Sequence, residues 1–417
     1  MFCHGYQSWS ESTWRTIGVD ADPSRTPGVP QLVVESHGAA GPAALGELRS
    51  ELVTSFGDDP TVHAGPGALQ FLDGTLHGAT STFRSLEEWA SAQPGRAGAP
   101  FQVGWCSWYQ YFHTVTENDI RANLALADAW PFDVFQIDDG FQSEIGDWLI
   151  TNDKFPSTLD GLAGDIARAG RRPGLWIAPF LASPSSRVAT EHPDWFASHA
   201  SGRRLVGNVN EHWGGAVHVL DTTHPDVLAH LERLARDLVD LGFTYLKLDF
   251  TYAPGIAGAY ADPMCPPRER VRRGFEAIRR GAGEEAFLLG CGAPIASCVG
   301  IVDGMRIGPD VAPWWEPRAH FPGYAASAPS TSNALRATRA RQFMHRRLWL
   351  NDPDCVMLRT THSDLTRDQV HTCAHAVGDS GGMVLVSDDL ALLGADERAL
   401  LDDVIARGRE IDSQLVR

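Results

Sequence analysis

Residues 225–250 read PDVLAHLERLARDLVDLGFTYLKLDF, and this stretch combines the two patterns that decide the fold. Over residues 225–241 apolar residues recur at intervals of three and four, which predicts an amphipathic helix. Residues 244–249 form a short apolar run, which predicts a buried β-strand. A helix and a buried strand in succession are the repeating parts of an α/β fold.

The same succession recurs along the chain after residue 100. Eight such units over about 300 residues predict a (β/α)8 TIM barrel, with residues 396–408 in its eighth helix. In the unit quoted above, Thr222 and Thr223 are the expected helix caps and Gly242 its end. The eight apolar runs begin at Val103, Val134, Pro173, Thr244, Ala286, Gly304, Trp349 and Gly382.

Residues 1–95 follow a different pattern. They are rich in Gly, Ser, Pro and Thr, and alternating segments at 31–36 and 48–53 predict strands joined by tight turns. Residues 93–100 have the composition of a linker. We therefore expect an α/β protein with a short, partial β-sandwich-like N-terminal domain over 1–95 and a catalytic barrel over 100–417.

Composition excludes several classes of partner. The 417 residues carry 35 basic and 52 acidic side chains, a formal net charge of −17, which argues against binding to nucleic acid or an anionic membrane. No apolar run approaches the ~18 residues of a membrane span, and the N-terminus does not resemble a secretory signal. Seven cysteines without C-x-x-C spacing are typical of free thiols in a cytoplasmic protein.

Charged residues mark two of the predicted strands. Lys247 and Asp249 share one face of a buried strand, and Arg306 and Asp310 repeat this theme about sixty residues later. Buried charges are costly unless a site uses them. Polar residues also end most other predicted strands, where TIM barrels place their active sites, although any single aspartate there could be a helix cap. They include Asp138, Asp139, Cys291, Asp352, Asp354, Asp388 and Asp389. Near the strand ends are also tryptophans that could stack on a sugar face or pack the barrel core: Trp105, Trp108, Trp176, Trp314 and Trp315.

Two carboxylates, each with a cation on its own strand, are suited to glycoside cleavage. Such enzymes place one carboxylate on a face of the sugar and a proton donor near the leaving oxygen. Asp249, kept ionised by Lys247, is the expected nucleophile. Asp310 lies beyond Gly308 and Pro309, where partial burial would hold it protonated as the acid. The alternative is that Lys247 and Asp249 form a structural ion pair in the barrel core.

At these residues the chain resembles the retaining α-galactosidases of clan D, particularly glycoside hydrolase family 36, the melibiase group. The resemblance runs in order through residues 100–390. It rests on Gly104-Trp-Cys-Ser-Trp108, Ile137-Asp-Asp-Gly140, Gly174-Leu-Trp176, Tyr245-Leu-Lys-Leu-Asp249, Arg306 to Asp310 and Asn351-Asp-Pro-Asp354.

The resemblance implies a role for each matching residue. Asp249 would be the nucleophile and Asp310 the general acid/base. Asp138 and Asp139 would bind the C4 and C6 side of the sugar in subsite −1. The other implied substrate-binding residues are Lys247 and Arg306 around C2 and C3, Trp108 and Trp176 as pocket walls, and Cys291 and Asp354 near C2. The resemblance implies no cofactor and no metal, and a small carbohydrate as the substrate.

Departures from the family pattern leave alternatives open. Ile177-Ala-Pro-Phe180 stands where many relatives carry Glu-Pro-Glu, and Cys291-Gly-Ala-Pro294 differs from the usual strand 5. Galactose, N-acetylgalactosamine or another α-sugar is therefore compatible with the site. A raffinose- or stachyose-type galactosyl transferring synthase, a metal-dependent barrel enzyme and a catalytically inactive sugar-binding barrel are the other readings. Monomer and homo-oligomer both stay open.

Overall fold

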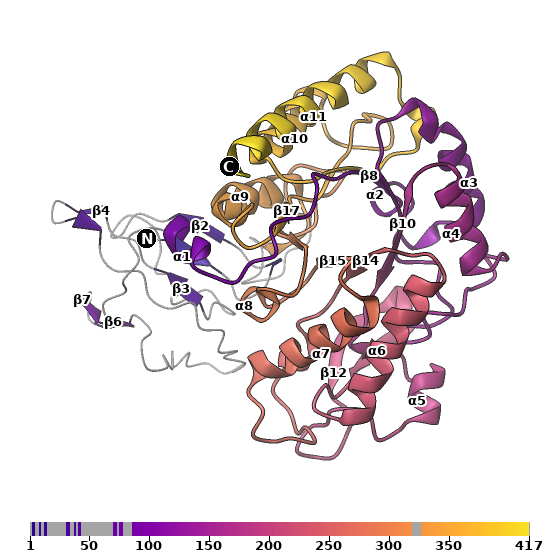
Figure 1. The fold of residues 1–417 in the computed structure, drawn as a ribbon, viewed down its shortest axis with the longest axis vertical. Coiled ribbons are helices and arrows are strands. Elements are labelled where there is room, and N and C mark those ends of the chain that lie inside the picture. Colours follow the sequence, from indigo (N-terminus) through magenta and orange to yellow (C-terminus); the bar gives the residue numbers. More distant parts are fainter. Residues whose placement is uncertain are drawn as a thin grey trace.

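The structure is a computed structural model that describes residues 86–318 and 327–416, the pair Ser8–Trp9, and the backbone of seven short strands before residue 78 (Figure 1). These strands are β1 (Phe2–His4), β2 (Ser12–Trp14), β3 (Gln31–Val33), β4 (His37–Gly38), β5 (Gly41–Pro42), β6 (Gln70–Leu72) and β7 (Thr75–His77). β1 pairs antiparallel with both β2 and β3. The strand predicted at 48–53 lies outside the described residues, and the division into two domains stays a prediction.

One parallel sheet forms the centre of the molecule. Its strands are β8 (Val103–Cys106), β9 (Val134–Ile137), β10 (Arg172–Ile177), β14 (Tyr245–Leu248), β15 (Phe287–Gly290), β16 (Gly304–Arg306), β17 (Leu350–Asp352), β18 (Cys355–Val356) and β19 (Val384–Val386). Their order is β17-β16-β15-β14-β10-β9-β8-β19-β18. Only Pro353 and Asp354 separate β17 from β18, so the two ends of this order are halves of one strand. The sheet therefore closes on itself, and the predicted TIM-barrel fold is confirmed.

Helices surround the strands on the outside of the barrel (Figure 1). The long ones are α3 (Glu117–Leu126), α4 (Leu159–Arg168), α6 (Pro225–Asp240), α7 (Pro267–Ala282), α9 (Thr331–Arg341), α10 (Arg367–Ser380) and α11 (Ala395–Leu415); α1 (Leu86–Ser91), α2 (Trp108–Tyr111) and α5 (Arg187–Glu191) are short. Between β15 and β16 the connecting helix is reduced to the four residues of α8 (Ile295–Cys298). The helical layer is therefore thin at this one crossing, and α9 instead contacts β2 of the N-terminal segment.

Helix α6 forms where the apolar periodicity predicts it, but its cap differs from the prediction. His224 is the N-cap residue, and its Nδ1 accepts a hydrogen bond from the backbone N–H of Asp226. Thr222 and Thr223 are occupied elsewhere, because Thr222 donates to the carbonyl of Arg270 and Thr223 to the carboxylate of Asp221. Pro at the first helical position favours this start. Gly242 follows the helix with φ +108°, as predicted.

A small antiparallel sheet interrupts the unit that follows β10. It consists of β11 (Leu181–Ala182), β12 (Val206–Asn210) and β13 (Gly215–Val219), with β13 in the middle. The short 3-10 turn Glu211–Trp213 joins β12 to β13. This excursion brings Trp213 back to the carboxyl ends of the barrel strands, where it contacts Asp139.

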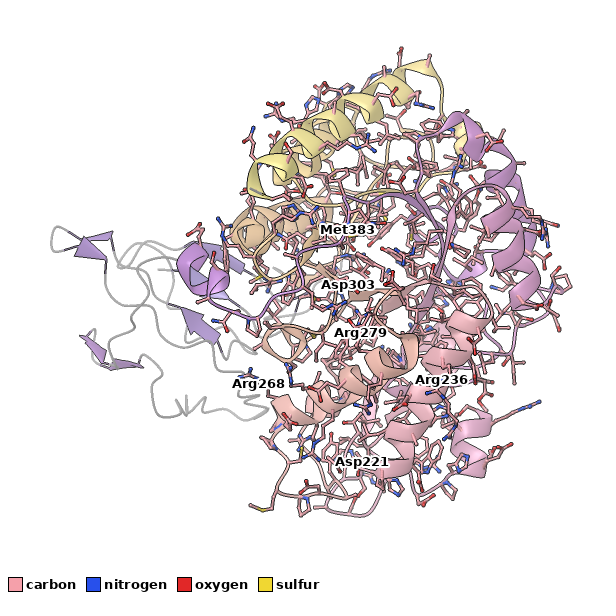
Figure 2. All side chains as sticks on the ribbon, in the orientation of Figure 1. Asp221, Arg236, Arg268, Arg279, Asp303 and Met383 are labelled. Atoms are coloured by element: carbon pink, nitrogen blue, oxygen red, sulfur yellow. The ribbon has the colours of Figure 1, made fainter. Side chains whose placement is uncertain are left out.

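The amino ends of the strands carry a buried ion cluster of their own. Asp303, immediately before β16, accepts hydrogen bonds from Arg279, from Arg96 and from the backbone N–H of Leu288. Figure 2 shows Arg279 and Asp303 side by side. Arg279 also donates to the carbonyls of Ile301, Gly283 and Ala286, so this arginine joins several chain segments at the base of the barrel. None of the helices in the described part of the chain is both long and apolar enough to span a membrane.

Candidate active site

The carboxyl end of the barrel gathers the residues that the strand-end argument predicts. Lys247 on β14 forms an ion pair with Asp138 after β9, with 2.8 Å between Nζ and Oδ2. Asp138 also accepts from Gln136 and from the backbone N–H of Asp139. β9 and β14 are the second and fourth strands of the barrel, and alternate strands contribute interior side chains to the same layer. Lys247 therefore reaches Asp138 across β10. The expectation that Lys247 pairs with Asp249 is wrong: its direct partner is Asp138.

Asp249 is held instead by an indole and by the backbone. Its Oδ2 accepts from Nε1 of Trp176 at 2.9 Å, and its Oδ1 accepts from the backbone N–H of Phe250 at 2.8 Å. Phe250 has φ +52°, a left-handed conformation that is strained for a bulky residue. This turn points the peptide N–H back at the carboxylate. Asp249 is buried, yet both of its oxygens have donors.

Asp139 is buried next to Asp138. Gln142 donates to its Oδ1 at 2.6 Å and Trp213 to its Oδ2 at 2.8 Å. Burial raises the pKa of Asp139 to about 6; the charges of Asp138 and Asp249 act in the same direction, and the two donors oppose them. Asp139 therefore sits at the boundary between charged and neutral near neutral pH.

One guanidinium organises the opposite wall. Arg306 on β16 contacts Asp310 at 3.0 Å, Asp352 at 3.3 Å and Asp354 at 2.8 Å. Asp354 lies in the break between β17 and β18 with φ +80°, and it accepts hydrogen bonds from the hydroxyl of Tyr109 and from the backbone N–H of Val311. The break between β17 and β18 at this residue turns its carboxylate into the mouth of the barrel. The arginine thus balances three carboxylates.

Asp310 is the only one of these three carboxylates that remains accessible, with 34% of its side chain exposed, against 0% for Asp352 and Asp354. Burial by the surrounding protein raises the pKa of Asp310 to about 7. Arg306 and Lys247 lower it, whereas the charges of Asp354 and Asp249 raise it further. Asp310 is therefore an accessible carboxyl that can hold a proton near neutral pH and give it up, as a general acid requires.

Other predicted residues divide into those near the site and those outside it. Cys291, directly after β15, is fully buried, and burial raises the pKa of its thiol, so it is protonated at neutral pH. Trp108 is half-buried and packs edge-on against Phe112 at 5.3 Å. Trp105 stacks on Phe135 at 4.2 Å in the core, which contradicts its expected role as a sugar platform.

The two aspartates after β19 have structural roles. Asp389 caps the 3-10 turn that follows by accepting from the backbone N–H of Ala391, as the alternative reading of such residues foresaw. Asp388 is buried, pairs with Arg359 and accepts from the backbone N–H of Leu358. Trp314 is half-buried, with its indole donating to the carbonyl of Pro329 and Arg318 over its ring. No contact of these residues reaches the paired carboxylates.

Four residues at the site were not found from the sequence: Trp9, Tyr109, Gln142 and Trp213. Trp213 comes from the inserted sheet, and its indole lies 4.8 Å from the ring of Phe250. The ring of Trp9 lies 4.8 Å from the same ring, although Trp9 belongs to an N-terminal segment more than 200 residues away in sequence. Neither residue belongs to a periodic pattern, so no sequence signal places it here. Within the described ranges no cluster of three or more His, Cys, Asp or Glu side chains has the arrangement of a metal site.

A closed barrel with carboxylates, a lysine and an arginine at its carboxyl end is an arrangement that suits the class of the barrel glycoside hydrolases. Comparison with known proteins narrows it. The Melibiase family model matches residues 105–259. Alpha-galactosidase AgaA of Geobacillus stearothermophilus is 27% identical over 213 residues, which are 49% of this chain and 28% of AgaA. The chain thus aligns with less than a third of that relative's length.

Solved structures extend the match over the whole chain. TtGalA, an alpha-galactosidase from Thermus thermophilus, in complex with p-nitrophenyl alpha-D-galactopyranoside shares 30% sequence identity and a TM-score of 0.77, over 98% of this chain and 86% of TtGalA. TtGalA in complex with stachyose gives 29% identity and a TM-score of 0.78, over 97% and 90%. GH36 alpha-galactosidase AgaA, at 17% identity and a TM-score of 0.57 over 80% and 46%, shares the fold. The chain belongs to the melibiase family, glycoside hydrolase family 36.

Proposed function

We propose that this chain is a retaining α-galactosidase that hydrolyses terminal α-galactosyl residues of small oligosaccharides. The observation that carries the proposal is the contrast between Asp249 and Asp310. Asp249 is fixed as a hydrogen-bond acceptor by Trp176 and a backbone N–H, whereas Asp310 has its pKa raised to about 7 and remains accessible. The charge of Asp249 also raises the pKa of Asp310, and both residues follow strands of the same barrel, Asp249 after β14 and Asp310 beyond β16.

Each carboxyl group then has one task in each of two steps. Asp249 attacks the anomeric carbon, while Asp310 gives its proton to the departing glycosidic oxygen. Asp310, now ionised, takes a proton from water, and the water cleaves the covalent glycosyl-enzyme with net retention. The sugar would be held by Trp108, Asp138, Asp139, Trp176, Lys247, Cys291, Arg306 and Asp354.

The binding of stachyose and of an aryl α-galactoside by TtGalA supports a carbohydrate substrate with a terminal α-galactosyl group. We also propose that the protein acts in the cytoplasm. The six cysteines of the described part of the chain are free and buried, as is usual for a reducing compartment.

The direct test replaces the nucleophile. Asp249→Ala should reduce kcat on p-nitrophenyl α-galactoside by about 10³-fold or more, because no covalent intermediate can form. Asp389→Ala is the matched control: it removes another strand-end aspartate, costs about 1 kcal/mol of stability as a lost cap, and leaves kcat near the wild-type value. Wild-type turnover by Asp249→Ala would refute the assignment.

Azide rescue tests the stereochemical part. With an activated aryl galactoside, azide should restore turnover of Asp249→Gly by direct displacement and yield the β-azide. With Asp310→Gly it should react with the glycosyl-enzyme and yield the α-azide. The reverse assignment of products would exchange the two roles.

A panel of α-glucoside, α-N-acetylgalactosaminide and α-galactoside substrates, with and without a sugar acceptor, separates galactosidase from the N-acetyl and synthase alternatives.

A further inference from the structure

The Ser8–Trp9 segment lies against the turn that leads from β15 into α8. The backbone N–H of Ser8 donates to the carbonyl of Ala293 at 3.0 Å, and the hydroxyl of Ser8 accepts from the N–H of Ala293 at 3.3 Å. Trp9 follows and lies on Gly292, where an added Cβ would come within 3.0 Å of the indole. A glycine is needed there both for this close approach and for its φ of +54°.

A buried arginine fastens this segment to the barrel. Arg341, at the end of α9, is fully buried, and its Nη1 donates both to the carbonyl of Ser8 and to the carbonyl of Ile307, the latter at 2.9 Å. Ile307 directly follows Arg306, the partner of Asp310. One guanidinium nitrogen therefore joins the N-terminal segment to the strand end that carries the general acid.

The same segment also reaches the nucleophile. The ring of Trp9 packs edge-on against Phe250 at 4.8 Å, and Phe250 is the residue whose left-handed backbone directs its N–H to Asp249. A strained residue keeps its conformation only where its surroundings hold it there. Trp9 and Trp213, whose rings both lie edge-on to that of Phe250 at 4.8 Å, provide this support.

We propose that Arg341 is a positioning residue for the reaction: it holds Ser8–Trp9 against the barrel, and Trp9 in turn holds Phe250 and thereby the carboxylate of Asp249. Arg341 itself contacts none of the reacting atoms. Burial lowers the pKa of its guanidinium to about 9, which leaves it protonated at neutral pH. The proposal rests on the proposed α-galactosidase function, and it adds that the N-terminal segment is part of the catalytic apparatus.

The test compares Arg341→Met, Arg341→Lys and Trp9→Leu with the wild type on an aryl α-galactoside. A misplacement of about 1 Å can cost roughly 10²-fold in rate, so we expect kcat to fall about 10- to 100-fold in Arg341→Met with a smaller change in KM. Trp9→Leu should fall similarly, and the double variant should be no slower than the slower single variant. Arg341→Lys, which keeps a donor, should recover part of the loss.

Arg279→Met is the control, because Arg279 is also a buried arginine that donates to backbone carbonyls, but it lies at the opposite end of the barrel and additionally pairs with Asp303. It should lose stability and keep its kcat. Wild-type kcat in folded Arg341→Met, or losses that multiply in the double variant, would overturn the proposal. If Arg341→Met does not fold, Arg341→Lys and Trp9→Leu are compared instead. Wild-type kcat in Trp9→Leu, or losses that multiply when Arg341→Lys and Trp9→Leu are combined, would then overturn the proposal.

Hydrogen exchange separates a failure of this proposal from a failure of the proposed function. Peptides covering residues 245–255 should exchange faster in Arg341→Met and Trp9→Leu than in the wild type, and not in Arg279→Met. A wild-type enzyme inactive on every α-galactoside would refute the proposed function. Faster exchange in Arg341→Met and Trp9→Leu would still support the positioning of Phe250 by Arg341 and Trp9. Unchanged exchange in both variants would refute this positioning role, whatever the substrate is.

Discussion

Replacing Lys247 by methionine tests the reassigned ion pair at the centre of the site. Nζ of Lys247 lies 2.8 Å from Oδ2 of Asp138, and the two residues are 5% and 2% exposed. Methionine keeps the apolar stem and removes the charge, which leaves Asp138 as a buried carboxylate without its cation. Breaking a buried pair from one side costs about 3–5 kcal/mol, because the remaining charge stays desolvated.

The chain provides its own control, since Lys154 is its other lysine. Lys154 is half-buried and donates to a backbone carbonyl, that of His113, and not to a carboxylate. Lys154→Met should therefore cost about 1–2 kcal/mol. Adding Asp138→Asn to Lys247→Met removes the orphaned charge, and the double variant should recover at least about half of the loss.

The assay is the free energy of unfolding from denaturant titrations at neutral and mildly alkaline pH. Burial alone would lower the pKa of Lys247, but the carboxylate of Asp138 raises it well above its ordinary value. A raised lysine pKa gives stability that is fully present below the unfolded pKa and is lost only as the pH rises through the folded one. The difference between wild type and Lys247→Met should thus be constant between about pH 7 and 9. A loss below about 1 kcal/mol, or no recovery in the double variant, would refute the pairing.

The remaining predictions concern protons at the site. The kcat/KM of the wild type should decrease above about pH 7, tenfold per unit, because Asp310, whose raised pKa is about 7, loses the proton it must donate; a pH profile of Asp310→Asn should lack this limb. Trp213→Phe removes one of the donors that lower the pKa of Asp139, so this pKa should rise above about 6 and KM should increase about tenfold. An unchanged KM would show that the hydrogen bond from Trp213 to Asp139 does not contribute to substrate binding.

The fold was predictable because its signals are local and repeated. The barrel strands are short runs of almost entirely buried residues, as in Val134–Ile137, and helices such as α6 have an apolar stripe. Parallel strands bring their carboxyl ends to one rim, so the polar residues that follow them had to meet. The cap of α6 escaped prediction because Thr222, Thr223 and His224 can all accept from a helix terminus, and tertiary contacts decide among them.

The partners within the site were less predictable than its members. Strand parity places Lys247 and Asp249 on one face, but it cannot tell that a long side chain will cross β10 to Asp138. The residues that contact Asp139, Asp354 and the ring of Phe250 come from segments without periodicity: an inserted sheet, the first turn after β8 and the N-terminal Ser8–Trp9. Such contacts depend on three-dimensional packing between segments far apart in sequence, and a single sequence carries no sign of them.

The departure at Ile177-Ala-Pro-Phe180 can now be separated from the departure at Cys291. Ala178 and Phe180 are fully buried, and Phe180 packs edge-on against Phe275 of α7 at 5.6 Å, so the side chain of Phe180 belongs to the layer between barrel and helices. Cys291 lies instead beside Asp249, Arg306, Lys247 and Asp310, close enough for its ionisation to be affected by their charges. Phe180 therefore tells little about which sugar is bound. Under the proposed function, Cys291 is the position to vary when galactose is compared with its 2-acetamido analogue as substrate.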